Sequence, residues 1–295
     1  MNRVLANKKL IFIFIFPAFL FFSLVVIVPI LYTGYLSTLE WNGYSDSIFI
    51  GFRNYVEMFS DFPKGFTKGI INSGILAFLS IFVQVPLALI LALVISKGIK
   101  GEGVFRTSYF IPVIISTTVI GQLWLKIYQP NYGMLNYMLE AIGLSELKRP
   151  WLASTETALA CTFFVIVWQY IGYHMLLLYS AIKSIPKSLF EAAKVDGARN
   201  AQIARFITIP LIKPMIKVCA TFALIGSLKT FDLIYVLTKG GPIHATEVPT
   251  TIMYRVLITE NNYGLGSAMA IFIILECLIF TVFIQKAFKT ENYTY

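Results

Sequence analysis

Residues 184–210 read SIPKSLFEAAKVDGARNAQIARFITIP, and this polar stretch lies between two strongly apolar runs of the chain. Its first half is typical of a short helix. Pro186 and Ser188 are favoured near helix starts, and Ser188 with Glu191 three residues later matches a capping box. Gly197 then offers the left-handed conformation that ends many helices. We therefore predict a helix that begins near Ser188 and ends before Gly197.

A second short helix is predicted over residues 200–206, and Asp196 is a further candidate for its cap. Leu189, Phe190 and Val195 leave apolar side chains on the first helix, although it lies outside the flanking apolar runs. A helix of this kind needs a surface against which its apolar side is buried. The two helices together therefore predict a docking element.

The runs on either side of this element are long enough to cross a bilayer, which takes about 20 mainly apolar residues. Lys213 and Lys217 interrupt the start of the run that follows. Six such runs occur in the whole chain, at about 10–36, 70–95, 105–127, 157–182, 207–228 and 267–288. We therefore expect an all-α membrane protein with six transmembrane helices, built as a single domain over residues 1–295.

The composition agrees with lipid as the main solvent. Of the 295 residues, 57% are hydrophobic and 13% are charged, whereas a typical soluble protein has about 25% charged residues. A soluble fold of this size cannot hide so much apolar surface, which excludes a soluble enzyme, a nucleic-acid-binding domain and a disordered chain. The spacing of the three cysteines fits neither a metal site nor a disulfide framework, so we interpret them as small buried hydrophobic residues.

The first apolar run follows the basic residues Arg3, Lys8 and Lys9, as the core of a secretory signal peptide does. Its apolar length exceeds the ~7–15 residues of such a core, and no clear small-residue cleavage site follows it. We therefore expect a retained helix.

Lys and Arg residues predict the orientation of the chain, because cytoplasmic loops carry an excess of them. The N-terminus with Arg3, the loops 96–106 and 183–206, and the tail with Lys289 are basic and alternate so that they share one side. The other loops are longer and have sparser basic residues, among them Lys64. Both termini are therefore predicted to be cytoplasmic, and the net charge of +9 mostly reflects this bias.

The docking element resembles the EAA loop of the inner-membrane permease subunits of binding-protein-dependent ABC importers. The pattern of that family is Glu-Ala-Ala, three residues, Gly, nine residues and then Ile-x-Leu-Pro. This chain has Glu191-Ala192-Ala193, then Gly197, then Ile207-Thr208-Ile209-Pro210. Every spacing fits, and the only departure is Ile209 in place of Leu.

The flanking sequence resembles the carbohydrate permeases of that family. Residues 185–198, 231–242 and 263–270 carry this resemblance, which extends over about residues 10–290. It is closest to the first permeases of the maltose, lactose and glycerol-phosphate type. The resemblance implies the type I importer permease fold and a position in the prokaryotic inner or plasma membrane.

The resemblance also implies partners and a division of labour. A second homologous permease completes the pathway, a dimer of cytoplasmic ABC ATPases drives it, and an extracytoplasmic solute-binding protein delivers a sugar or oligosaccharide. This chain is then a non-catalytic subunit that binds no cofactor and no metal, because the ATPase uses ATP and Mg²⁺. In agreement, the sequence contains no Gly-x4-Gly-Lys-Ser/Thr phosphate-binding loop.

The loop over residues 183–206, with its entry into the membrane, is expected to couple the chain to the ATPase. Glu191 is expected to contact a basic residue there; the alternative is that it only completes the capping box. The residues expected to carry the coupling are Glu191, Ala192, Ala193, Asp196, Gly197, Ile207 and Pro210.

Polar and aromatic side chains at membrane depth are candidates for the sugar pathway. Gln169 and Tyr173 are four residues apart and share a helix face, and amides and aromatic rings suit sugar hydroxyls and sugar rings. Tyr173, Ser227 and Thr230 also lie where the resembling permeases contact substrate. The alternative for all four is interhelical hydrogen bonding or an interfacial aromatic belt. We interpret His174 as a packing residue.

Glu276 lies in the middle of the sixth run, where a carboxylate is costly and faces protein or water. Its candidate partners are Lys126, a pathway group and the second permease. An ion-coupled secondary transporter that uses Glu276 is the rival class, although it leaves the 191–210 pattern unexplained. Within the family, the alternative is another solute such as a glycerol phosphate. The pattern disfavours a strongly anionic solute, because Lys126 is the only cation we predict at pathway depth.

Overall fold

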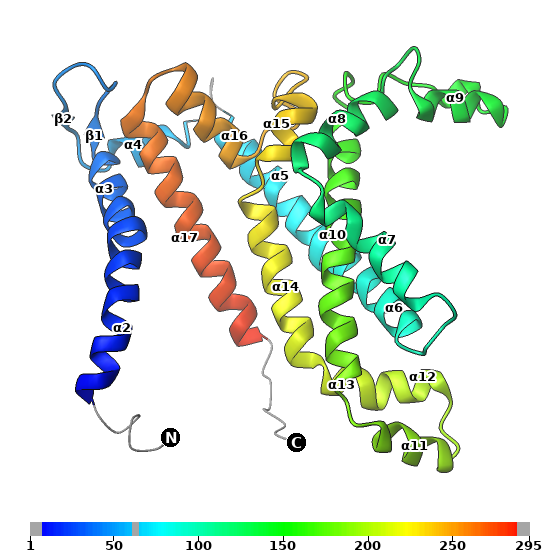
Figure 1. The fold of residues 1–295 in the computed structure, drawn as a ribbon. Helices are drawn as coiled ribbons and strands as arrows, with labels where there is room; N and C mark the ends of the chain where they lie inside the picture. The colour runs from blue at the N-terminus through cyan, green and yellow to red at the C-terminus, as the bar shows by residue number, and fades with distance from the viewer. Residues whose placement is uncertain (1–7, 61–64, 288–295) are drawn as a thin grey trace. The chain divides into compact units, whose positions relative to one another are not determined.

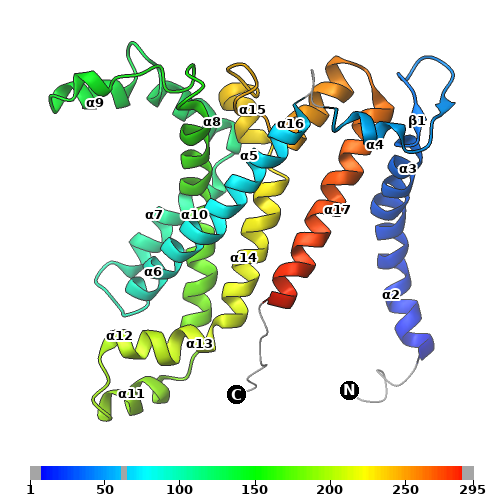
Figure 2. The same ribbon diagram turned by 180° about the vertical axis from the view of Figure 1, so that it is seen from behind.

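The computed structural model describes residues 8–60 and 65–287, and it is helical throughout these ranges apart from one short strand pair, loops and turns. Figures 1 and 2 show the ribbon from two opposite sides. The basic residues Arg3, Lys64 and Lys289, which entered the orientation argument, lie outside the described residues, as does residue 288 at the end of the sixth run. Contacts divide the chain into two compact units: Met1–Lys64 with Met253–Ile274, and Gly65–Ile252 with Leu275–Tyr295.

The first unit begins with the predicted first membrane helix. Helix α2 (Lys8–Phe22), a π-helical turn (Ser23–Ile27) and α3 (Val28–Leu36) form one run. Its apolar part, Ile11–Leu36, has a mean hydropathy of 3.0. None of the side chains in that apolar part is buried within the protein, as suits a helix whose surroundings are lipid.

A small loop structure follows in the same unit. Strands β1 (Leu39–Glu40) and β2 (Ile48–Phe49) pair antiparallel and lead to α4 (Arg53–Glu57). The buried Asn54 side chain donates to the carbonyl oxygens of Ser37 and Leu39, at 2.9 and 2.8 Å. Helix α17 (Tyr263–Ala287) starts against this loop. Gly264 lies so close to the Leu39 carbonyl that any side chain at this position would collide with it. These contacts fix the turn that follows the first membrane helix.

The second unit contains the longest helices. Helix α5 (Phe66–Leu79), a π-helical turn (Ser80–Gln84) and α6 (Val85–Ile95) form one 30-residue apolar run, and α10 (Ala158–Lys183) is a single helix of 26 residues. Within the described residues, four helices are long and apolar enough to cross a membrane, and up to six if each of two bent pairs counts as one span. The predicted runs 70–95, 157–182 and 267–288 correspond to three of the four.

Two of the predicted runs are not straight helices. Helices α7 (Glu102–Ile114) and α8 (Thr117–Ile127) meet at 97°, because the backbone at residues 115 and 116 is extended between them. The prediction of one uninterrupted helix over residues 105–127 was therefore wrong. A sharp turn at these two residues ends the first helix and re-aims the second.

The predicted run 207–228 was wrong at its start. Helix α14 runs over Lys213–Leu228, and it meets the preceding helical segment Asn200–Leu211 at 71°. Pro214 lies in the first turn of α14, where its missing N–H leaves no hydrogen bond unmade. The membrane helix therefore begins at the lysine that seemed to interrupt it, and residues 207–211 belong to the docking element.

The core of the second unit lies where α6, α10 and α14 pack together. Ala88 and Ala92 of α6 are fully buried beside Met175 and Leu178 of α10 and Cys219 of α14. Small residues at such positions let helix backbones approach closely. A side chain on Gly172 of α10 would collide with the backbone of α7 at Tyr109, so glycine is required where these helices cross.

The loop regions of this unit also contain short helices. Residues 128–157 include α9 (Met134–Ala141) and a 3₁₀ turn (Ser145–Leu147). Helix α15 (Asp232–Thr238) follows α14. Helix α16 (Pro249–Tyr254) starts in this unit, and the π-helical turn that continues it (Arg255–Thr259) belongs to the first unit. The three cysteines are free and at least partly buried, as expected.

Candidate functional site

The docking element starts with α11 (Lys187–Val195), two residues earlier than the predicted capping box requires. Pro186 occupies the position before the helix, with φ −56° and ψ 131°, and no side chain caps the helix. Ser188 is therefore already inside the first turn, and the capping box predicted for Ser188 and Glu191 is wrong. The fixed φ of proline sets the helix start instead.

The predicted end of this helix is confirmed. Gly197 has φ 76°, in the left-handed region. The N–H of Ala198 donates to the carbonyl of Ala193 at 2.9 Å, and the N–H of Gly197 donates to that of Lys194 at 3.0 Å. This pair of bonds is a Schellman motif, which needs a left-handed residue at the position of Gly197.

The second helix begins at the predicted residue but ends later than predicted. Helix α12 (Asn200–Ile203), a π-helical turn (Ala204–Thr208) and α13 (Ile209–Leu211) are continuous. Asp196 does not cap α12; the Arg199 N–H donates to the side chain of Gln202 at 2.7 Å at that end. In the structure the predicted docking element is therefore α11–α13, residues 187–211, which we call the docking segment from here on.

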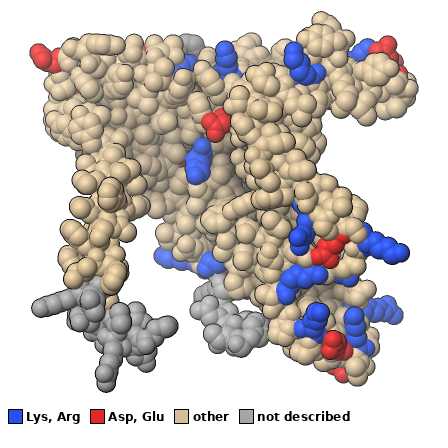
Figure 3. All heavy atoms as spheres, viewed as in Figure 1, with Lys and Arg blue, Asp and Glu red and all other residues tan. Residues whose placement is uncertain are grey.

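The docking segment leaves much of its surface uncovered. Glu191, Ala192 and Asp196 are exposed, and Ala193 is buried. Val195 is 88% exposed and Phe206 is 68% exposed, which is unusual for apolar side chains outside a membrane helix. Of the other residues expected to couple, Gly197 and Pro210 are exposed and Ile207 is half-buried. Figure 3 shows acidic and basic side chains gathered around this end of the unit.

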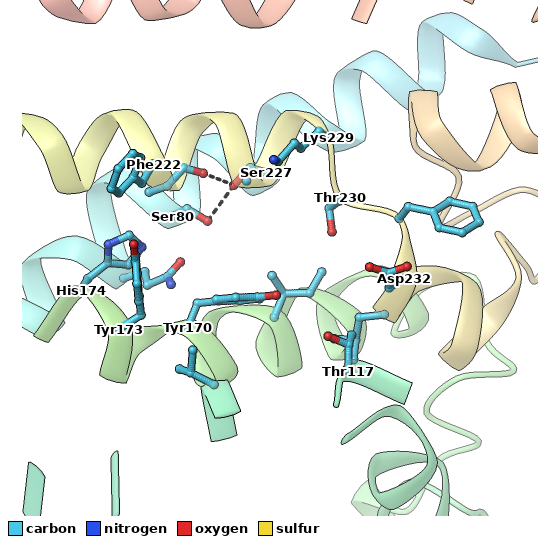
Figure 4. Close-up of a pocket in the computed structure, with 17 residues that line it drawn as sticks. Ser80, Thr117, Tyr170, Tyr173, His174, Phe222, Ser227, Lys229, Thr230 and Asp232 are labelled. Atoms are coloured by element: carbon cyan, nitrogen blue, oxygen red, sulfur yellow. Dashed lines mark hydrogen bonds between the residues drawn. The ribbon is translucent and has the colours of Figure 1, made fainter. Parts of the chain in front are cut away.

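The second candidate site is a cavity of about 360 Å³ in the middle of the same unit. Its walls come from the α5–α6 run, the α7–α8 turn, α10, and the end of α14 with the start of α15. Figure 4 shows that the side chains of Tyr170, Tyr173 and Asp232 lie on one side and those of Phe222 and Ser227 on the other. The lining therefore mixes aromatic rings with hydroxyl, amide, imidazole and charged groups.

Three of the four predicted pathway residues line this cavity. Tyr173 lies edge-on to His174 with ring centroids 5.4 Å apart, and its ring is 6.3 Å from that of Phe222. The Ser227 hydroxyl lies 2.9 Å from the Ser80 hydroxyl and 2.8 Å from the carbonyl of Ala223. Thr230 also lines the cavity, just beyond the end of α14.

Gln169 does not reach the cavity. Its side chain is 1% exposed, and Nε2 donates to the Pro112 carbonyl at 3.3 Å, toward α7. A separation of four residues rotates a side chain by about 40° around a helix. That rotation is enough for Gln169 to face α7 while Tyr173 faces the cavity. The two side chains therefore do not share the cavity, contrary to the prediction from their spacing. His174, interpreted as a packing residue, is buried but also lines the cavity.

Tyr170, Lys229 and Asp232 also line the cavity, and the sequence argument did not select them as pathway residues. No ion pair within 4 Å joins Lys229 and Asp232, or involves either of them, in the described part of the chain. A signal was present, because both charges lie within three residues of Ser227 or Thr230. The prediction that Lys126 is the only cation at pathway depth was therefore wrong, because Lys229 lines the cavity and Lys126 does not.

Glu276 lies on α17, where it is buried, and its Oε2 has no hydrogen-bond partner among the described residues. Its proposed partner Lys126 is exposed on α8. Neither residue lines the cavity, and no ion pair joins them in the described ranges. A Glu276–Lys126 pair within this chain was therefore wrong.

Comparison with known proteins agrees with these features. Residues 62–290 match the family described as "Binding-protein-dependent transport system inner membrane component". The chain is 40% identical over 287 residues to the probable ABC transporter permease protein YurN of Bacillus subtilis, covering 96% of this chain and 97% of that protein. It is 30% identical over 281 residues to the trehalose/maltose transport system permease protein MalF of Thermococcus litoralis, covering 95% and 94%.

Solved structures resemble this one over nearly the whole chain. A bacterial ABC transporter that imports the acidic polysaccharide alginate contains a chain with a TM-score of 0.83 and 25% identity, with 97% of each chain covered. The same fold recurs, at a TM-score of 0.82 and 26% identity, in an alginate transporter in complex with a periplasmic protein that holds an alginate pentasaccharide. That coverage is again 97% of each chain.

Proposed function

The chain belongs to the family of binding-protein-dependent transport system inner membrane components, and from that premise we propose that it lines the pathway of an ATP-driven importer for a sugar or oligosaccharide. The cavity carries this proposal, because it combines aromatic rings with hydrogen-bonding side chains at the depth of the membrane helices. Aromatic faces bind the apolar faces of sugar rings, and a few placed polar groups orient the hydroxyls. Relatives named for trehalose and maltose, and for diacetylchitobiose, support the substrate class.

The proposal includes the membrane arrangement. We propose six spans, with each bent pair counted as one, and both termini in the cytoplasm. The alternation of basic segments supports this orientation. It places the docking segment on the cytoplasmic side and residues 128–157 and 239–248 outside.

The docking segment is proposed to contact a cytoplasmic ABC ATPase through Glu191, Ala192, Ala193, Asp196, Gly197, Ile207 and Pro210. Its exposed apolar and charged side chains support this role. The chain itself is proposed to bind no cofactor and no metal, since ATP and Mg²⁺ belong to the ATPase. A second permease and an extracytoplasmic binding protein complete the importer.

Both helices that enter the docking segment also reach the cavity. Tyr173 lies on α10, which ends at Lys183 just before α11. Ser227 lies near the far end of α14, which starts at Lys213 just after α13. With a rise of about 1.5 Å per residue, these helices are rigid levers about 15–20 Å long between the two sites. Movement of the docking segment by the ATPase is proposed to shift both cavity walls as rigid bodies.

Uptake by the complete importer in proteoliposomes tests this function. The chain, its second permease, the ATPase and the binding protein are reconstituted, and a panel of labelled oligosaccharides is offered with and without ATP. We expect ATP-dependent uptake of at least one sugar. Uptake of amino acids or inorganic ions instead, with every sugar excluded, would overturn the proposed substrate class.

An acidic sugar is the second candidate, and Lys229 is the observation that favours it. Its cation lines the cavity without an ion-pair partner in the described part of the chain. A cation there attracts carboxylate groups, whereas Asp232 opposes them. Replacing Lys229 with Gln distinguishes the two substrates: uptake of uronic-acid oligosaccharides falls if they are the cargo, while uptake of neutral oligosaccharides changes little.

A further inference from the structure

The external arm, residues 128–157 with helix α9, has no part in the proposed function. Its inner side is firmly held. The buried Asn136 side chain donates to the carbonyls of Pro130 and Arg149, at 2.9 and 3.1 Å. The Trp151 indole N–H donates to Asn136 Oδ1 at 2.7 Å. Helix α9 is therefore a fixed part of the unit, and its outer surface is a fixed surface.

The outer surface of α9 is an apolar stripe. Tyr137 is 71% exposed and Ile142 is 68% exposed. The stripe consists of Met134, Tyr137, Met138, Ala141 and Ile142, all exposed. Their spacing of i, i+3, i+4, i+7 and i+8 places them on one side of a helix. None of them packs against a core cluster of the described chain.

Four charged residues of the arm form two ion pairs with one another, and Glu146 is exposed. Lys148 donates to Glu140 at 2.9 Å, and Arg149 lies 3.4 Å from Glu156. In Figure 3, blue and red spheres lie on the upper edge of the arm, and its lower edge, toward the membrane helices, is tan. The lower edge of the arm therefore offers apolar contact.

The position of the arm points to lipid. Both ribbon views show α9 at the level of the ends of α8 and α10, extending away from α5, α14 and α15. Exposed apolar residues also lie on the neighbouring helices α7 and α8, among them Ile114, Val119 and Leu123. An exposed apolar stripe at the level of these helix ends suits the membrane–water interface, where tyrosines such as Tyr137 are typical.

We propose that α9 lies in the outer interface of the membrane, with Met134, Tyr137, Met138 and Ile142 among the acyl chains. The helix anchors the outer ends of α8 and α10 to the lipid surface. A short amphipathic helix of this kind rests with its apolar side about 5–10 Å into the boundary between headgroups and acyl chains. The stripe therefore contacts lipid, and the solute-binding protein contacts other parts of the outer surface.

Spin-label accessibility in the assembled importer tests this placement. The three native cysteines are replaced by serine or alanine, and single cysteines replace Met138 or Ile142 on the stripe. Leu123→Cys on α8 is the lipid-facing control, and Ser145→Cys in the arm is the exposed polar control. Each labelled complex is placed in phosphatidylcholine–phosphatidylglycerol nanodiscs, and only variants that elute as the unlabelled complex does are measured.

The stripe labels are expected to be accessible to oxygen and protected from a water-soluble nickel chelate, as at Leu123. Their depth should correspond to the interface, about 5–10 Å below the headgroups. The label at Ser145 should be highly accessible to the nickel chelate. Nickel accessibility at Met138 and Ile142 equal to that at Ser145 would overturn the proposal. Protection that appears only after the binding protein is added would overturn it too, because the stripe would then be a protein contact.

Discussion

Single residues decide where the helices of the cavity can approach one another. Gly172 permits α10 to cross the backbone of α7, and that crossing turns Gln169 toward Pro112 while Tyr173 faces the cavity. Tyr173, Ser227 and Thr230 were predicted as pathway residues from their chemistry and from a family resemblance, and all three line the cavity. The sequence could not exclude Gln169, because the neighbour that covers it is remote in the chain.

Replacing Gly172 with alanine is expected to destabilise the protein by about 1–3 kcal/mol, since the added methyl group overpacks the helix crossing. Gly74→Ala is the matched control, because a methyl group there meets nothing within 4 Å. The control should be neutral or slightly stabilising, by up to about 1 kcal/mol. Thermal unfolding in the same detergent measures both. Equal melting temperatures for the two variants would contradict the close crossing.

Replacing Tyr173 with alanine is expected to lower sugar affinity in uptake by about 2–10-fold, the worth of one aromatic contact. Tyr173→Phe keeps the ring and should lose much less. The concentration dependence of uptake in proteoliposomes is the measurement. Tyr44→Ala, at an exposed tyrosine in a loop of the other unit, is the control. Unchanged uptake by Tyr173→Ala would remove this residue from the pathway.

At the scale of elements, three prolines share one solution. Pro29, Pro86 and Pro210 each lie two residues after a π-helical turn, namely Ser23–Ile27, Ser80–Gln84 and Ala204–Thr208. A proline has no N–H and its ring clashes with the carbonyl four residues earlier. The wider turn moves that carbonyl aside, so the helix continues. Hydropathy alone gives no means to predict these wider turns.

One end of helix α11 in the docking segment was predictable from the sequence, and the other end was not. Its helix end was predictable because Gly197 acts locally, through φ 76° and the Schellman bonds. Its helix start was not, because two plausible first residues, Pro186 and Ser188, lie two positions apart. The sequence also could not show that the segment continues to Leu211, since hydropathy alone assigns residues 207–211 to the membrane.

Replacing Gly197 with valine is expected to destabilise the end of α11 by about 1–2 kcal/mol, because a side chain disfavours the left-handed conformation. Space is not the cause, since nothing lies within 4 Å of the added Cβ. Hydrogen exchange over residues 187–198 should accelerate while the melting temperature changes little. Gly103→Ala, another glycine with open space, is the control. Unchanged exchange in Gly197→Val would contradict the role of this turn.

At the scale of the molecule, the apolar runs were predictable and their shapes were not. The sequence located six runs, and the structure has helices in all of them, but two are bent by 97° and 71°. A run of apolar residues reports length and hydropathy, whereas a bend depends on a few backbone angles. Both bends shape the site: one places the α7–α8 turn in the cavity wall, and the other separates the docking segment from α14.

The central claim is that this chain is a pathway subunit driven through its docking segment by a separate ATPase. Mass spectrometry of what co-purifies with the tagged chain in mild detergent tests it most directly, with Glu191→Lys compared against Glu140→Lys on the external arm. Wild type and Glu140→Lys should retain a second permease and an ABC ATPase. Glu191→Lys should keep the permease and lose the ATPase. Retention of the ATPase by Glu191→Lys at the wild-type level, or a wild-type chain that purifies alone, would contradict the account.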